Sequence, residues 1–150
     1  MALIVQKYGG TSVGDLEKIE GVAKRIDKYV KGGDSVVAVV SAMSGETNKL
    51  VALGNDISNG KPDQREMDSL TASGEQVSTA LLAMALKKLG VEAISLLGDQ
   101  VQIQTDSLHG KARIKKIETN RLSEIIDSGV VPVIAGFQGV DRHNNITTLG

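Results

Sequence analysis

The sequence contains no cysteine and no tryptophan, and its only aromatic residues are Tyr8, Tyr29 and Phe137. Without cysteine the chain has no disulfide scaffold, no thiolate zinc site and no cysteine nucleophile, a composition that fits a reducing compartment. So few aromatic rings argue against a surface on which nucleic-acid bases stack. Any site in this chain must therefore work without thiols and almost without aromatic rings.

An excess of charge is missing as well, since 17 Lys and Arg nearly balance 18 Asp and Glu and leave a formal net charge of −1. Such a chain has no global field that would attract nucleic acid or an anionic membrane. No apolar run approaches the ~20 residues of a membrane span, and the first residues lack the charge pattern of a secretory signal. We therefore expect a cytoplasmic protein with no nucleic-acid partner and no membrane partner.

Common ligand motifs are absent too. The two histidines, His109 and His143, do not have the spacing of paired metal ligands. The glycines that follow Lys7 do not fit the G-x-G-x-x-G dinucleotide motif, and Gly60-Lys61-Pro62 does not complete a P-loop. We expect no protein-bound metal and no conventional nucleotide motif.

What the chain does contain is an alternation of apolar strands and helical segments. Its 150 residues suit one domain, because a domain commonly holds about 100–200. Residues 36–40 are apolar at every position, which is typical of a strand buried on both faces of a parallel sheet. Pro132 weakens the last strand, because proline cannot donate to a ladder. The pattern predicts an α/β sandwich with strands at residues 3–5, 36–40, 93–97 and 130–135. Helices are expected at residues 16–30, in a stretch after residue 48 that ends at about residue 58, between residues 62 and 90, and at residues 122–127.

The helix expected between Pro62 and Gly90 carries two separate signals. Gly74-Glu75 interrupts it with a glycine, which costs about 1 kcal/mol against alanine in a helix interior. This indicates either a close approach of backbone or ligand at that point or a helix boundary. Apolar residues at helical spacing predict a buried face made of Leu70, Val77, Leu81, Met84 and Leu89.

Two polar, glycine-containing loops directly follow expected strands. Residues 7–14 place a lysine and paired glycines at a strand end, where backbone amides can approach a phosphate; the alternative is an ordinary tight turn. Residues 41–48 bring hydroxyls and an amide to the same edge; the alternative is a helix entry capped by Ser44 or Thr47. Ligands of α/β sheets bind beyond the carboxyl ends of the strands, so both loops are candidate binding loops.

Several segments, in order along the chain, closely resemble the N-terminal half of bacterial aspartokinases, which are amino-acid kinases. The matching segments are residues 7–13, 39–48, 73–78, 109–114, 135–140 and 147–150. The Lys-x-Gly-Gly opening is shared by other amino-acid kinases, whereas residues 41–48 and Gly74-Glu75 point specifically to aspartate. The resemblance covers essentially the whole chain.

The resemblance implies a fold and an activity. The fold is a three-layer α/β/α sandwich with a mainly parallel central sheet, here apparently truncated. Aspartokinases transfer a phosphoryl group from ATP, with Mg²⁺, to the side-chain carboxylate of L-aspartate. The product, 4-phospho-L-aspartate, enters lysine, threonine and methionine biosynthesis. Because an aspartate side chain with a pKa of about 3.9 is already ionised at neutral pH, the nucleophile needs no general base.

The same resemblance implies roles for individual residues. Lys7 would be the catalytic cation that stabilises the transferring phosphoryl group. The nucleotide and its phosphates would be bound by Lys7, Tyr8, Gly9, Gly10 and Ser41. Aspartate would be bound by Gly45, Glu46, Thr47, Asn48 and Glu75. Glu75 would hold the α-ammonium, and Mg²⁺ would bind the nucleotide phosphates rather than protein ligands.

The resemblance also implies that residues 1–150 are the substrate-side, N-terminal portion of a kinase domain. In the family an Arg-Gly-Gly-Ser-Asp segment, the ATP-binding half and regulatory domains follow this point. We therefore expect the 150-residue chain to be inactive alone, and the full-length protein to form a homo-oligomer. The alternatives are another amino-acid kinase, acting on glutamate or acetylglutamate, and a non-catalytic binding module on the same fold.

Overall fold

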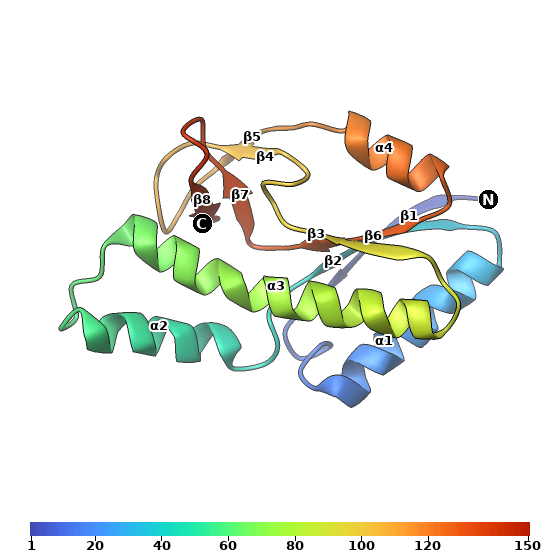
Figure 1. Cartoon of the computed structure of the whole chain (residues 1–150), viewed down its shortest axis with the longest axis horizontal. Coiled ribbons are helices and arrows are strands. Elements are labelled where there is room, and N and C mark those ends of the chain that lie inside the picture. The colour runs from blue at the N-terminus through green and yellow to red at the C-terminus, as the bar shows by residue number, and fades with distance from the viewer.

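The computed structural model describes residues 1–150 and has a parallel four-stranded sheet at its centre, with strand order β1-β2-β6-β3. Helices α1 and α3 cover one face and the shorter α4 covers part of the other, so the structure has three layers (Figure 1). This confirms the expected α/β architecture. The elements named here are β1 (Leu3–Tyr8), β2 (Ser35–Val40), β3 (Ala93–Leu96), β6 (Val131–Ala135), α1 (Leu16–Lys31), α3 (Gln64–Lys88) and α4 (Asn120–Asp127).

A second, smaller sheet lies at the N-terminal end of α3, and helix α2 (Glu46–Ile57) packs along the same part of α3 (Figure 1). The side chain of Gln138 ties this sheet to α3 by donating to the Ala72 carbonyl at 3.0 Å. The sequence pattern does not predict this separate sheet, because strands of three or four residues carry too little periodicity. The sheet has the order β5-β4-β7-β8, made of β4 (Ile103–Thr105), β5 (Ile114–Ile117), β7 (Gln138–Val140) and β8 (Ile146–Thr148).

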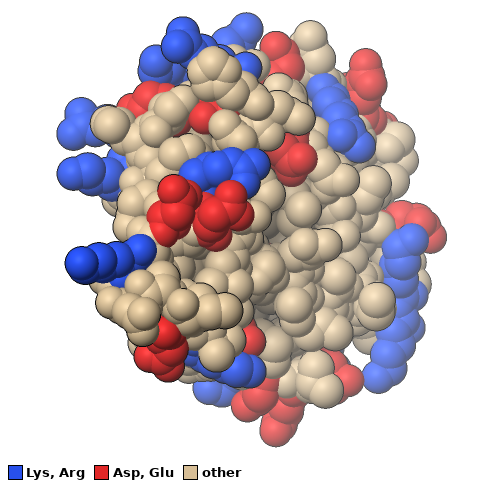
Figure 2. Space-filling model, turned by 60° about the vertical axis from the view of Figure 1, so that its left-hand side comes forward, with Lys and Arg blue, Asp and Glu red and all other residues tan.

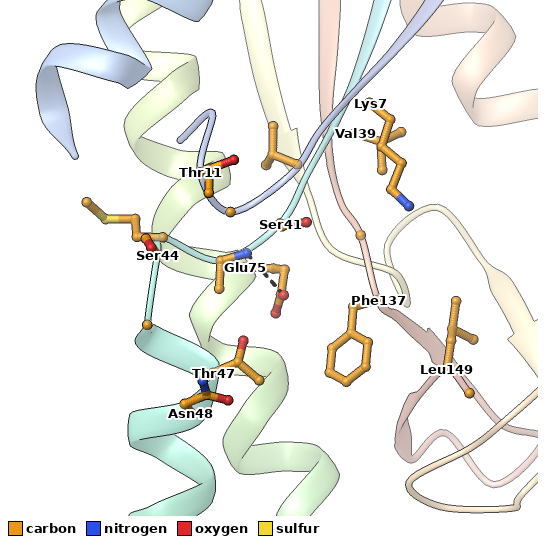
Figure 3. A pocket seen from close by; sticks show the side chains of 17 residues that line it. Lys7, Thr11, Val39, Ser41, Ser44, Thr47, Asn48, Glu75, Phe137 and Leu149 are labelled. Carbon is orange, nitrogen blue, oxygen red and sulfur yellow. Dashed lines mark hydrogen bonds between the residues drawn. The ribbon is translucent and has the colours of Figure 1, made fainter. Parts of the chain in front are cut away.

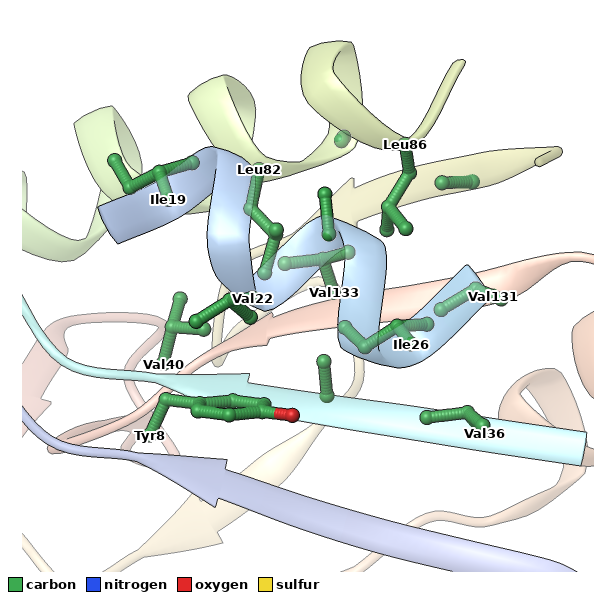
Figure 4. Close-up of a cluster of buried hydrophobic side chains, with 14 of the residues drawn as sticks. Tyr8, Ile19, Val22, Ile26, Val36, Val40, Leu82, Leu86, Val131 and Val133 are labelled. Atoms are coloured by element: carbon green, nitrogen blue, oxygen red, sulfur yellow. The ribbon is translucent and has the colours of Figure 1, made fainter. Parts of the chain in front are cut away.

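The main hydrophobic core lies between the central sheet and helices α1 and α3 (Figure 4). Val36 and Val37 are neighbours on β2 and point to opposite faces, yet both are buried, as expected for this strand. Val36 packs in the main core, whereas Val37 joins a smaller cluster under α4. The main core includes Ile19, Ala23 and Ile26 of α1, Leu82 and Leu86 of α3, and Val40 and Val133 of the sheet.

The predicted apolar face of α3 needs correction. On α3, Val77 and Met84 are exposed, and the helix instead buries small and polar residues along much of its length. The buried polar side chains of α3 are satisfied by their neighbours. Its carboxylates and hydroxyls form hydrogen bonds with backbone groups of the loops and strands that pack against the helix.

Two further expectations concern Pro132 and the membrane. Pro132 lies inside β6, but β2 pairs with β6 only from Val133 onward, so no ladder bond to β2 is lost there. None of the four helices has the length and apolar character that crossing a bilayer requires.

Candidate active site

A pocket opens at the carboxyl edge of the central sheet, where the loops after β1, β2 and β6 meet helices α2 and α3 (Figure 3). Lys7 and Glu75 are the charged side chains among the residues that line it. The face of the molecule that Figure 2 shows has charged side chains around its edge and a broad stretch right of its centre without any. Of the residues expected at the site, the pocket brings together Lys7, Gly10, Ser41, Gly45, Thr47, Asn48 and Glu75.

Lys7 and Tyr8 lie next to each other on β1 and point to opposite faces of the sheet. The Lys7 side chain is exposed and reaches the pocket. The Tyr8 ring packs in the main core, and its hydroxyl donates to Gln6 Oε1 at 2.6 Å. Burial raises the pKa of Tyr8, with Arg25 acting in the opposite direction. The expected nucleotide contact through Tyr8 is therefore not available to its side chain.

The loop after β1 packs directly on the loop after β2. A Cβ added at Gly10 would lie 3.3 Å from the Ala42 carbonyl oxygen, so this close approach favours glycine. Gly9 has open space around it and is not among the lining residues. Thr11 does line the pocket, although the sequence singled out no role for it.

The loop after β2 leads into α2 through Gly45, whose φ of +78° lies in the left-handed region that favours glycine. The segment does enter a helix, but α2 has no side-chain cap, so the alternative of capping by Ser44 or Thr47 is wrong. Thr47 and Asn48, in the first turn, line the pocket, whereas Glu46 does not. An uncapped first turn leaves backbone amides that favour a bound anion.

Glu75 is the most unusual side chain of the pocket. It is only 2% exposed, and Oε1 accepts a hydrogen bond from the Ala42 amide at 3.2 Å (Figure 3). Its second oxygen, Oε2, has no hydrogen-bond partner. Desolvation by burial raises the pKa of Glu75, and the hydrogen bonds from its own amide and that of Ala42 only partly offset this. A buried carboxylate with a free oxygen is poised to receive a cation or a hydrogen-bond donor.

Gly74 explains how α3 comes so close to the β2 loop. The helix runs through Gly74 without a break, and a Cβ added there would lie 2.9 Å from the Ala42 Cβ. The Ser78 hydroxyl, on the same side of the helix, donates to the Ser41 carbonyl at 2.7 Å. The expected close approach at Gly74-Glu75 is thus confirmed, and the alternative of a helix boundary is wrong.

The wall across the pocket from Glu75 includes Phe137 and Leu149 (Figure 3), and Gly150, next to Leu149, also lines the pocket. Phe137 has a φ of +67°, a conformation that bulky residues rarely adopt. The Leu149 amide donates to the Phe137 carbonyl at 2.8 Å, which joins the two parts of the wall. Sequence reasoning noted both segments as family matches but assigned them no role, since nothing local places them opposite Glu75.

Comparison with known proteins identifies relatives of the whole chain. The model of the amino acid kinase family matches residues 2–150. An aspartate kinase of Stutzerimonas stutzeri is 59% identical over 150 residues, which are 100% of this chain and 36% of that protein. The chain therefore spans a little over a third of this curated relative.

Solved structures share the fold. The aspartate kinase from Synechocystis superposes with a TM-score of 0.81 at 47% identity, over 99% of this chain and 24% of that chain. Aspartokinase III of E. coli, solved in complex with aspartate and ADP, gives a TM-score of 0.85 at 22% identity, over 100% of this chain and 44% of that chain. The second likeness is one of fold alone.

Proposed function

Because this chain belongs to the amino acid kinase family, we propose that it forms the substrate-side part of an aspartate kinase. Such an enzyme transfers the γ-phosphoryl group of ATP to the side-chain carboxylate of L-aspartate. The observation that carries the proposal is Glu75, a buried carboxylate with a free oxygen in the same pocket as Lys7. The identity of 59% with a protein named aspartate kinase supports aspartate as the substrate.

Glu75 is suited to bind the α-ammonium of aspartate. An ammonium group would donate to the unpartnered Oε2 and satisfy the one polar atom of this side chain that lacks a partner. The positive charge would also favour the ionised form of Glu75, which burial disfavours. The first turn of α2, with Thr47 and Asn48, offers amides, a hydroxyl and a carboxamide to a carboxylate of the same substrate.

Lys7 is suited to the phosphoryl group. Lys7 is the one cationic residue among those that line the pocket. Gly10 and Ser41 line the same pocket just after the ends of β1 and β2. We assign ATP phosphates to this end of the pocket, with Mg²⁺ carried on the phosphates. The structure has no cluster of three or more His, Cys, Asp or Glu side chains that could hold a metal.

The reaction needs no proton transfer. A carboxylate oxygen of aspartate forms a bond to the γ-phosphorus, the bond from that phosphorus to the oxygen bridging the β-phosphate breaks, and ADP leaves with the electron pair. The products are 4-phospho-L-aspartate and ADP. The protein contributes positioning and charge neutralisation, which Lys7 and backbone amides supply.

The length of the relatives bears on how much of the enzyme this chain represents. Since the chain matches 36% of the Stutzerimonas protein, we propose that the rest of the nucleotide site comes from a longer polypeptide. The 150 residues alone would then bind aspartate without turnover. Homo-oligomer formation by the longer protein and a cytoplasmic location belong to the same proposal.

Calorimetric titration of the chain with L-aspartate, L-glutamate and N-acetyl-L-glutamate tests the substrate. We expect L-aspartate to bind, and Glu75→Gln to weaken this about 10- to 100-fold, the value of hydrogen bonds to a charged group. Glu66→Gln is the matched control, because Glu66 is an exposed carboxylate on the same helix. Preferred binding of another substrate would indicate a different amino-acid kinase, and no binding at all would favour a non-catalytic module.

A second assay tests the partial-domain proposal. The chain is incubated with MgATP and aspartate, and hydroxylamine traps any acyl phosphate. We expect no steady product formation. Continued turnover by the 150-residue chain would show that it holds a complete kinase site.

A further inference from the structure

Asp68 is a second buried carboxylate on α3, about two helical turns before Glu75 and on the same face of the helix. It is 1% exposed, but unlike Glu75 both of its oxygens are fully engaged. It accepts from Thr148 Oγ1 at 2.6 Å, from the Thr148 amide at 3.1 Å, from His109 Nδ1 at 2.7 Å and from the Gly110 amide at 3.0 Å. Because a carboxylate only accepts, His109 carries a proton on Nδ1.

These donors lead directly to the pocket wall. Thr148 precedes Leu149 and Gly150, both of which line the pocket. The segment that Asp68 holds at Gly110 continues to Ala112, which donates to the Thr148 carbonyl at 2.9 Å and accepts from the Gly150 amide at 3.1 Å. Asp68 therefore forms hydrogen bonds with two segments of the chain, one at Gly110 and one at Thr148, and these two segments also form hydrogen bonds with each other.

We propose that Asp68 is a positioning residue that sets the width of the pocket by holding Thr148, and with it Leu149 and Gly150, at a fixed distance from Glu75. A helix is a stiff spacer, so residues on one face keep their separation. Glu75 and Asp68 lie at two points of the same helix, and Asp68 binds the opposite wall. The distance between the Glu75 carboxylate and that wall is therefore fixed by α3. That the ligand is aspartate rests on the proposed function.

His109 lies between Asp68 and the turn that joins β7 to β8. Its Nδ1 donates to Asp68, whereas its Nε2 lies 4.0 Å from Asp141 Oδ2, which is too far for a hydrogen bond. Asp141 organises that turn by accepting from the amides of His143 and Asn145, both at 2.9 Å. The turn leads straight into β8 and Thr148. The wall is thus held at Thr148 by Asp68 and at the start of β8 by the turn that Asp141 organises.

A structural role alone would predict something different. If Asp68 only stabilised the fold, its loss would lower the Tm while folded molecules kept their wall and their affinity. If it positions the wall, its loss opens Leu149 and Gly150 locally in a protein whose core stays closed. Amide hydrogen exchange and ligand affinity, measured well below the Tm, separate the two cases.

The experiment compares Asp68→Asn with Asp63→Asn, the same change at an exposed position at the start of the same helix. We expect Asp68→Asn to speed exchange of the Leu149 and Gly150 amides by about 10-fold or more, as for a lost charge-assisted bond, with Leu86 unaffected. The Kd for L-aspartate should rise by a similar factor. Asp63→Asn should change neither quantity.

Thr148 provides a second pair of variants should Asp68→Asn not fold. Thr148→Val removes the hydroxyl that donates to Asp68, whereas Thr148→Ser keeps it. We expect Thr148→Val to show the faster exchange and weaker binding and Thr148→Ser to restore both. Unchanged exchange at Leu149 and Gly150 in the folded variants would overturn the proposal, as would faster exchange with unchanged affinity.

The two proposals fail in different ways. If the wild-type chain binds no aspartate, the proposed substrate is wrong, and hydrogen exchange alone then decides whether Asp68 holds the wall. If the wild type binds aspartate and the Asp68 and Thr148 variants bind it equally well, the substrate proposal stands and the positioning role is wrong.

Discussion

The carboxylate of Glu75 accepts a hydrogen bond from the backbone amide of Ala42 at 3.2 Å, across 33 residues of sequence. This bond joins the middle of α3 to the loop that follows β2, and it leaves Oε2 free in the pocket. Neither segment makes the site alone. The loop supplies an amide that holds the carboxylate, and the helix supplies a buried anion at the edge of the sheet.

The contact depends on Gly74, and Gly74→Ala should therefore destabilise the protein. The added Cβ would lie 2.9 Å from the Ala42 Cβ, and overpacking of this kind costs about 1–3 kcal/mol. Gly21→Ala in α1 is the matched control, because nothing lies within 4 Å of its added Cβ. There the same substitution should stabilise by about 0.5–1 kcal/mol through helix propensity. Urea unfolding of both variants measures the change in the free energy of unfolding, which should be opposite in sign for the two. Equal changes would show that the packing of α3 against Ala42 is not tight.

Glu75→Gln should make the ligand-free protein more stable at neutral pH. Burial raises the pKa of Glu75 above 4.5, so the folded state binds its proton more tightly than the unfolded state does. The stability this proton confers is present below pH 4.5 and is lost as the pH rises through the raised pKa. The difference in Tm between variant and wild type should therefore grow across this window and then level off. A difference independent of pH would contradict this account.

Lys7→Ala should spare the fold and remove the chemistry. The side chain is exposed at the end of β1, so the Tm should change little. In a longer polypeptide that turns over, loss of this cation should lower kcat about 10²- to 10³-fold, as for other groups that stabilise transition-state charge. Lys49→Ala, an exposed lysine of α2, is the control. A rise in KM with kcat unchanged would contradict this role, because it would show that Lys7 binds the ground state and the transition state equally well.

Phe137→Gly should be more stable than Phe137→Ala. At a φ of +67° a residue with a Cβ is strained by about 1–2 kcal/mol, and only glycine removes this strain. Both variants lose the same half-exposed ring, so their difference isolates the backbone conformation. Thermal or urea unfolding of the pair gives the value. If alanine were the more stable, the left-handed conformation of Phe137 would be contradicted.

Sequence reasoning succeeded where a local pattern carries the information. The apolar run at residues 36–40 predicted a strand buried on both faces, and the glycine in α3 predicted a close approach. It failed for Val77 and Met84, because helical periodicity weighs apolar residues while α3 buries polar groups that find partners elsewhere in the fold. It also failed for the Tyr8 side chain, where strand alternation placed the ring in the core.

By itself, the sequence determined the fold class, the family and the positions of the two polar loops, since these follow from strand and helix patterns and from short motifs that each lie within one stretch of chain. Only the tertiary structure decided that Glu75 keeps a free oxygen, that Phe137 and Leu149 face it, and that Asp68 holds Thr148. The physical reason is distance along the chain. Asp68 and Thr148 are 80 residues apart, and no local pattern specifies which buried acceptor meets which donor.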